Sequence, residues 1–348
     1  MMPAQTGDPA ARRGGVFPEG NKAQSLGLVS VLLLFGLTAC AGEKKAALPE
    51  GERREAAPAA AAKSVAAPPV EAETPTPARR VDAERAMRYV RQVVGFGSRP
   101  PGSPAHKKLE GYLRAQLRRD ALEEDAFVAE TAAGPLPMRN FIVRYPGSKD
   151  GVIVIATHYD TNLPLKNYVG ANDGGSGTGL LLELANQLRG KKREGYSVWL
   201  VWLDGEEAVR EWSATDGLYG SRHLAEKWQK DGTLKRIQAF LLADMVGDAD
   251  LNIERDGNST PWLLDLVLAA ATRLGYQSHF YRRSVTIEDD HLPFARAGVA
   301  VADLIDFDYG YNNVFHHTPD DTLDKLSPRS LEIVGNVLLE TVRLLDAR

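Results

Sequence analysis

The sequence predicts an α/β domain with a central mixed, mainly parallel sheet and helices on both faces. From about residue 81 to the C-terminus, short apolar strands alternate with segments of helical periodicity, the pattern of such folds. The segment 151–156 reads GVIVIA, a continuous apolar run that suits the buried centre of a parallel sheet. Acidic and histidine-containing segments follow several of the strands, so we expect a site at the carboxyl ends of the strands.

The elements can be placed in chain order from their periodicity. Apolar residues at Met87, Val90, Val93 and Val94 have helical spacing, and a Gly/Pro-rich loop follows at 97–104. Helical patterns predict helices at 83–94, 105–118, 177–188, 221–230, 262–274 and 328–345. Short apolar runs predict strands at 126–130, 140–145, 152–157, 197–203, 238–244 and 299–304.

The first forty residues have the features of an export signal. Basic residues precede an apolar stretch at 26–37, which is shorter than the roughly 20 residues that a membrane span needs. The stretch ends in Leu-Thr-Ala-Cys, which resembles a bacterial lipobox. We therefore predict that residues 1–40 are a lipoprotein signal peptide and that Cys40 is lipidated. The protein would then be anchored to a membrane and face the periplasm or the exterior. The alternative is an ordinary cleaved signal.

Composition divides the remainder of the chain. Residues 41–80 are rich in Ala, Pro and Glu, which predicts a disordered tether, and residues 81–348 form the predicted catalytic domain.

The chain has 42 Lys and Arg against 46 Asp and Glu, so no basic surplus supports nucleic-acid binding. Cys40 is the sole cysteine, which excludes an intramolecular disulfide.

Five segments concentrate acids and histidines, namely 158–160, 170–175, 204–207, 243–247 and 315–318. Carboxylates gathered around one sheet would repel one another unless a cation lay among them, and oxygen with imidazole ligands suits zinc. Glu206 and Glu207 are neighbours in an extended segment, so their side chains point in opposite directions. One carboxylate can therefore hold a metal while the other faces a substrate.

Several motifs resemble a known family. The strings GAND at 170–173, DGEE at 204–207 and HT at 317–318 resemble the zinc aminopeptidase clan. WSATDGLYGSRHLA at 212–225 and EDDHLPF at 288–294 are more similar to its glutaminyl cyclase branch, and the resemblance covers roughly 84–345. It implies cyclisation of N-terminal glutamine to pyroglutamate with release of ammonia. The expected substrate is a peptide or protein N-terminus, and we expect a monomer.

The resemblance also implies roles for individual residues. It makes Asp173, Glu207 and His317 the ligands of one zinc ion, and Glu206 the acid that carries the proton. Three further positions and a metal candidate follow from the same motifs: Asp244 and Asp289 as acids hydrogen-bonded around Glu206, Trp212 as a wall of the substrate pocket, and His158 as a possible ligand of a second zinc.

Two positions depart from the cyclase pattern. His316 stands where the cyclases carry Trp, and Glu288 stands where they often carry Gln. Both belong to the implied substrate pocket. Among the remaining histidines, His291 is expected to brace its loop, whereas His106 is expected to serve packing or lie on the surface.

Two other functions stay open. A two-zinc aminopeptidase would use five ligands, with Glu206 activating a bridging water: His158, Asp173, Glu207, Asp244 and His317. An inactive domain serving as a binding module is the third possibility, although the intact set of acids and histidines argues against it.

Overall fold

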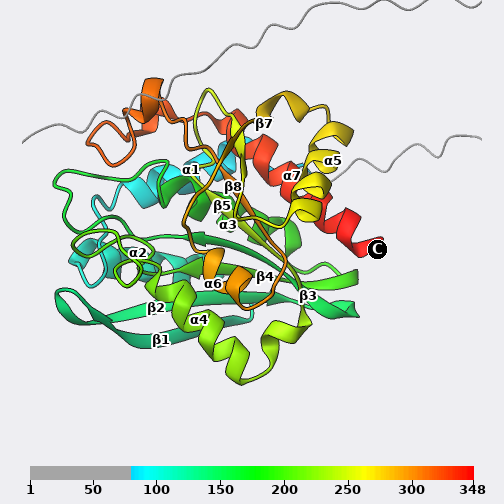
Figure 1. Cartoon of the computed structure of the whole chain (residues 1–348), viewed down its shortest axis with the longest axis horizontal. Coiled ribbons are helices and arrows are strands. Elements are labelled where there is room, and N and C mark those ends of the chain that lie inside the picture. The colour runs from blue at the N-terminus through cyan, green and yellow to red at the C-terminus, as the bar shows by residue number, and fades with distance from the viewer. Residues whose placement is uncertain (1–79) are drawn as a thin grey trace, which may run out of the picture. The chain divides into compact units, whose positions relative to one another are not determined.

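A computed structural model describes residues 80–348. The predicted signal peptide, Cys40 and the tether up to residue 79 lie outside the described residues. The described part forms a six-stranded sheet with helices packed against both of its faces (Figure 1). The strands lie in the order β1 (Leu122–Thr131), β2 (Gly134–Tyr145), β4 (Arg193–Leu203), β3 (Gly147–His158), β5 (Ile237–Asp244) and β8 (Val301–Ile305).

The sheet is mixed and mainly parallel, as predicted. β4, β3, β5 and β8 run parallel, while β1 and β2 are antiparallel strands at one edge. His158 at the end of β3 is opposite Leu203 of β4, and Asp244 at the end of β5 is opposite Ile305 of β8. The parallel strands therefore bring their carboxyl ends to one edge.

A second, two-stranded parallel sheet was not predicted. It consists of β6 (Ile253–Asp256) and β7 (Phe280–Val285). Their sequences, IERD and FYRRSV, are short and charged, so they lack the apolar alternation by which a strand is recognised in a sequence.

The helices pack around two hydrophobic cores, one on each face of the sheet. The larger core contacts α1 (Ala83–Val94), α2 (Pro104–Leu117), α3 (Gly175–Leu188), α5 (Pro261–Arg273) and α7 (Pro328–Asp346). The smaller core contacts α4 (Tyr219–Lys230) and α6 (Leu292–Arg296). Short 3-10 helices occur at Thr233–Arg236, Gln277–His279, Tyr311–Asn313 and Leu323–Lys325. Within 80–348, no helix has both the length and the apolar character needed to cross a membrane.

Local sequence explains where the helices begin. The side chains of Asp82 and Ser103 accept hydrogen bonds from backbone N–H groups in the first turns of α1 and α2. Proline occupies the start of α2, α5 and α7, where its missing N–H has no helical partner to lose. The two ends of the domain meet, because the Val81 N–H donates to Asn336 Oδ1 of α7 over 2.9 Å.

Candidate active site

The acidic segments predicted from the sequence surround one cavity at the carboxyl ends of the parallel strands. His158 ends β3, Asp244 ends β5, and the Glu206–Glu207 pair follows β4. The cavity has a volume of about 460 Å³. Its polar lining consists of Asp173, Glu206, Glu207, Trp212, Asp244, Thr286, Glu288, Asp289, His316 and His317. Of the predicted site residues in the described chain, only His158 is absent from this lining, and it lies buried directly behind it.

Asp173, Glu207 and His317 come together from three separate loops. His317 Nε2 lies 3.4 Å from Asp173 Oδ2 and 3.2 Å from Glu207 Oε2. Two ligands that are 2.0–2.1 Å from a tetrahedral zinc ion are about 3.3 Å apart, so these separations fit a zinc site. Glu207 Oε1 is buried and has no hydrogen-bond partner in the structure, which leaves it free to bind a cation. The distances from His317 to the two carboxylates therefore suit ligands of one zinc ion, and Asp173 and His317 also belong, with His316, to a group whose possible ligand atoms lie within 4.8 Å of one another.

Asp173 is fixed by the turn that leads into α3. Gly174 has φ +69°, and a Cβ at this position would lie 2.5 Å from the Asp160 carbonyl oxygen. Only glycine lets the chain pass this closely to the end of β3 with a left-handed conformation. The Tyr168 hydroxyl donates to the Asp173 carboxylate. Asp173 is thereby directed at His158 and His317.

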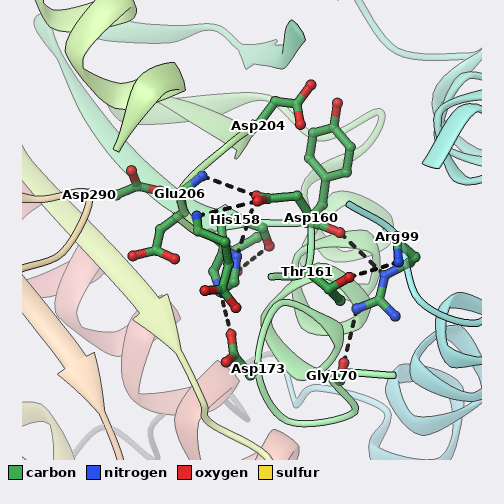
Figure 2. A network of polar contacts seen from close by, with 12 residues as sticks. Arg99, His158, Asp160, Thr161, Gly170, Asp173, Asp204, Glu206 and Asp290 are labelled. Atoms are coloured by element: carbon green, nitrogen blue, oxygen red, sulfur yellow. Dashed lines mark hydrogen bonds and ion pairs between the residues drawn. The ribbon is translucent and has the colours of Figure 1, made fainter. Parts of the chain in front are cut away.

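His158 belongs to a second group of possible metal ligands. Its Nε2 lies 3.0 Å from Asp173 Oδ1 (Figure 2) and 3.1 Å from Asp244 Oδ1. Asp173 is therefore shared between the two groups. Burial acts to lower the pKa of His158, but Asp244, Asp160 and Asp173 outweigh it and raise that pKa well above its ordinary value.

The Glu206–Glu207 pair is held through its backbone. The Asp160 carboxylate accepts a hydrogen bond from the Glu206 N–H (3.1 Å), as Figure 2 shows, and another from the Glu207 N–H (3.3 Å). The Glu207 side chain contacts His317 and accepts a hydrogen bond of 2.9 Å from Asn162 Nδ2. Burial raises the pKa of Glu206 well above its ordinary value, and repulsion by Asp289 and Glu207 adds to this against the attraction of His158. Glu206 can therefore keep a proton at a pH at which an exposed glutamate is ionised.

The expected hydrogen bonds among Glu206, Asp244 and Asp289 are not observed between described residues. Asp244 Oδ1 instead accepts from His158 Nε2 at 3.1 Å and from the Met245 N–H at 2.8 Å, because β5 ends beside the end of β3. Asp289 Oδ2 is buried without a hydrogen-bond partner. The three acids still line one cavity. Burial and repulsion by Asp244 raise the pKa of Asp289 well above its ordinary value.

The three predicted pocket residues also line the cavity. Trp212 is 38% exposed, and its Nε1–H donates to Glu288 Oε2 over 3.3 Å. His316 stacks on His317 with ring centroids 3.8 Å apart, and its Nε2 lies 4.0 Å from Asp173 Oδ2. His316 therefore also forms a group of possible ligands with Asp173 and His317. The sequence motif placed it only in the substrate pocket.

Arg99 was not predicted, although its loop was. Its side chain is fully buried and donates to the carbonyl oxygens of Tyr159, Gly97, Val169 and Gly170. Its backbone N–H donates to Thr161 Oγ1 over 2.7 Å (Figure 2). Arg99 thus joins the loop after α1 to the loops that carry Asp160 and Asp173. A single arginine within a Gly/Pro-rich loop gives no periodic signal that would mark it as buried.

Asp321 is a second residue that the sequence did not reveal. Its carboxylate accepts hydrogen bonds from the backbone N–H groups of Asn172 (2.8 Å) and Asp173 (3.2 Å), and from the Tyr309 hydroxyl (2.8 Å). Burial raises the pKa of Asp321 to about 6, with a further contribution from Asp173. The Asp321 carboxylate therefore fixes the backbone of Asp173, a possible metal ligand, although the two residues are 148 positions apart in the chain.

His291 and His106 lie in the interior. His291 is fully buried, with Nε2 3.3 Å from Asp256 Oδ2 and Nδ1 3.6 Å from Asp303 Oδ2. Neither ring nitrogen of His291 makes a hydrogen bond within the described residues, so its bracing role stays a prediction, and with Asp256 and Asp303 it forms a further group of possible metal ligands. His106 Nε2 lies 2.7 Å from Asp204 Oδ1.

This fold and site define a family. The sequence model of the family described as "Peptidase family M28" matches residues 140–342, and the chain belongs to this family. Within it, the relatives named glutaminyl cyclases match the chain over most of their length. A glutaminyl-peptide cyclotransferase-like protein of Bos taurus is 32% identical over 271 residues, which cover 69% of this chain and 70% of that protein.

Solved structures give the same family relationship. A glutaminyl cyclase of an Acidobacteriales bacterium is 52% identical, with a TM-score of 0.78, covering 80% of this chain and 99% of that one. A leucine aminopeptidase precursor of Bacteroides thetaiotaomicron is 26% identical, with a TM-score of 0.67, covering 76% of this chain and 98% of that one. The predicted fold class is confirmed by these likenesses.

Proposed function

We propose that this chain is a zinc-dependent glutaminyl-peptide cyclotransferase, which converts an N-terminal glutamine to pyroglutamate and releases ammonia. One observation carries the proposal. A buried acid, Glu206, adjoins a zinc-compatible group of Asp173, Glu207 and His317 in a single cavity. The 52% identity to a bacterial glutaminyl cyclase supports the same activity.

The chemistry requires a proton carrier and a polarised amide. The substrate's own N-terminal nitrogen attacks its side-chain amide carbon, a C–N bond forms, and ammonia leaves. Glu206 takes the proton from the attacking amine and returns it to the departing nitrogen. A zinc ion held by Asp173, Glu207 and His317 would act as a Lewis acid toward the amide oxygen. Buried Asp289 and Glu207 help keep the pKa of Glu206 raised, which suits a group that must both accept and give a proton.

A two-zinc aminopeptidase is the second candidate. The group of His158, Asp173 and Asp244 favours the aminopeptidase, because each residue offers one possible metal-ligand atom and these three atoms lie within 4.8 Å of one another. A solved structure titled as a leucine aminopeptidase precursor also shares the fold. Against it, the relatives that the chain matches include a glutaminyl-peptide cyclotransferase-like protein and a bacterial glutaminyl cyclase of 52% identity.

Metal content and product distinguish the two candidates. We expect one zinc per chain by elemental analysis, ammonia release from Gln-peptides, and little release of leucine from Leu-peptides. Two tightly bound zinc ions with rapid Leu-peptide hydrolysis would establish the aminopeptidase instead. If the zinc-loaded protein neither cyclised Gln-peptides nor hydrolysed Leu-peptides, the binding module would be favoured.

Lipid anchoring at Cys40 is a separate proposal, supported by the Leu-Thr-Ala-Cys sequence after an apolar run. The cyclase would then act at the periplasmic or exterior side of a membrane. In the natural host, Cys40→Ser should move the protein from the membrane fraction to the soluble fraction, with cyclase activity per molecule unchanged. Retention of Cys40→Ser in the membrane fraction would contradict the lipobox.

A further inference from the structure

We propose that Glu288 at the mouth of the active-site cavity selects substrates whose second residue is cationic. This inference rests on the proposed function, since it concerns the residue that follows the N-terminal glutamine. It adds a substrate class to that function: N-termini beginning Gln-Arg or Gln-Lys.

The exposure of the lining residues locates the mouth of the cavity. Trp212, Thr286 and Glu288 are exposed, whereas the acids and the metal-ligand candidates of the lining are buried or partly buried. A glutamine whose side-chain amide reaches the group of Glu206 and His317 must therefore leave its second residue near the exposed rim. Glu288 is the charged residue at this rim.

The negative charge of Glu288 favours a cation at that position. Glu288 is the exposed acid of the lining, and the lining contains no lysine or arginine of the described chain. Of the arginines on the preceding strand β7, Arg283 forms an ion pair with Asp308. No lysine or arginine of the lining therefore pairs with Glu288.

Trp212 gives the rim a second means of recognising a cation. Its indole N–H donates to Glu288 Oε2 over 3.3 Å, which positions the carboxylate beside the ring. The indole is 38% exposed, so part of its surface remains open to a ligand. A guanidinium or ammonium group can pair with the carboxylate and contact the aromatic face together. An acidic second residue would be repelled at the same place.

The test compares three dipeptide amides, Gln-Arg-NH₂, Gln-Ala-NH₂ and Gln-Glu-NH₂, which differ in charge only at the second side chain. For the full zinc-loaded protein at about 20 mM salt, we expect kcat/KM for the Arg peptide to exceed that for the Glu peptide roughly five- to tenfold. The difference should appear mainly in KM, because the contact is the same in the ground and transition states. It should shrink at about 0.5 M salt because exposed charges are screened.

Three variants isolate the carboxylate. Glu288→Gln keeps an acceptor for the Trp212 N–H and should reduce the Arg-to-Glu ratio to about one, and Glu288→Lys should invert it. Asp150→Asn makes the same charge change at a side chain that is 94% exposed and lies near the amino end of β3, so the ratio should stay at the wild-type value.

The outcomes separate this inference from the function beneath it. Cyclisation of the Ala peptide with equal kcat/KM for the Arg and Glu peptides would overturn the inference and leave the cyclase intact. A preference that survives in Glu288→Gln would also overturn it. Failure to release ammonia from any of the three peptides would overturn the proposed function, and this inference with it.

Discussion

Replacing Glu206 with glutamine should reduce kcat for Gln-peptide cyclisation by about 10²- to 10⁴-fold, the range typical of a lost general acid–base group. Glutamine has nearly the same shape as glutamate but cannot carry the proton between the amine and the leaving ammonia. KM should change little, and the zinc content should remain at the wild-type value. Steady-state kinetics together with elemental analysis of the purified variant measure both properties.

Glu207→Gln is the matched control, since it makes the same change one residue away. Glu207 faces His317 with the carboxylate 3.2 Å from the imidazole nitrogen, so its loss should lower zinc affinity. Dialysis should then remove zinc from Glu207→Gln more readily than from Glu206→Gln. If Glu206→Gln lost zinc while Glu207→Gln kept it, the roles of the two acids would be exchanged.

Replacing Arg99 with methionine should lower the free energy of unfolding by roughly 3–5 kcal/mol, as expected when a buried, hydrogen-bonded charge is removed. Methionine can fill much of the space, but it leaves four carbonyl oxygens without their donor. Urea unfolding followed by circular dichroism gives this value, provided that the slope with denaturant is unchanged.

Two further arginine variants give the reference points. Arg88→Met removes an exposed arginine of α1 and should change stability by no more than about 0.5 kcal/mol. Arg99→Lys keeps the charge but lacks the planar guanidinium group, whose several N–H donors reach several carbonyl oxygens. The free energy of unfolding of Arg99→Lys should therefore lie between those of the wild type and Arg99→Met. Equal stability of Arg99→Met and Arg88→Met would show that Arg99 does not hold the loops together.

The main sheet was predictable because its strands are apolar and its site residues follow the strand ends directly. The run at 151–156 and the positions of His158 and Asp244 needed only strand periodicity and the rule that parallel strands collect ligands at one edge. Residues that act through long-range backbone contacts gave no such signal. Asp321 is a loop acid like many others until the fold brings it to the backbone of Asn172 and Asp173.

The arrangement of the acids was also beyond the sequence. Motifs placed Asp244 and Asp289 near Glu206, and all three line the cavity, but the partner of Asp244 depends on strand register. With β3 and β5 adjacent, Asp244 meets His158 rather than Asp289. The second role of His316, close to Asp173, likewise depends on how the rings of His316 and His317 stack.

The contact between Val81 and Asn336 has a consequence for the timing of folding. These residues are 255 positions apart, yet the backbone entering α1 is hydrogen-bonded to the last helix. A Cβ on Gly335 would lie 2.7 Å from Val81 Cγ2, so the two segments also touch closely. During synthesis, α1 appears first but completes its packing only when α7 has left the ribosome. Until then the part of α1 that faces α7 stays uncovered, although the contact of α1 with α3 can already form, and contacts of such long sequence separation make folding slow. The surface of α1 that faces α7 is therefore among the last parts of the domain to be covered during folding.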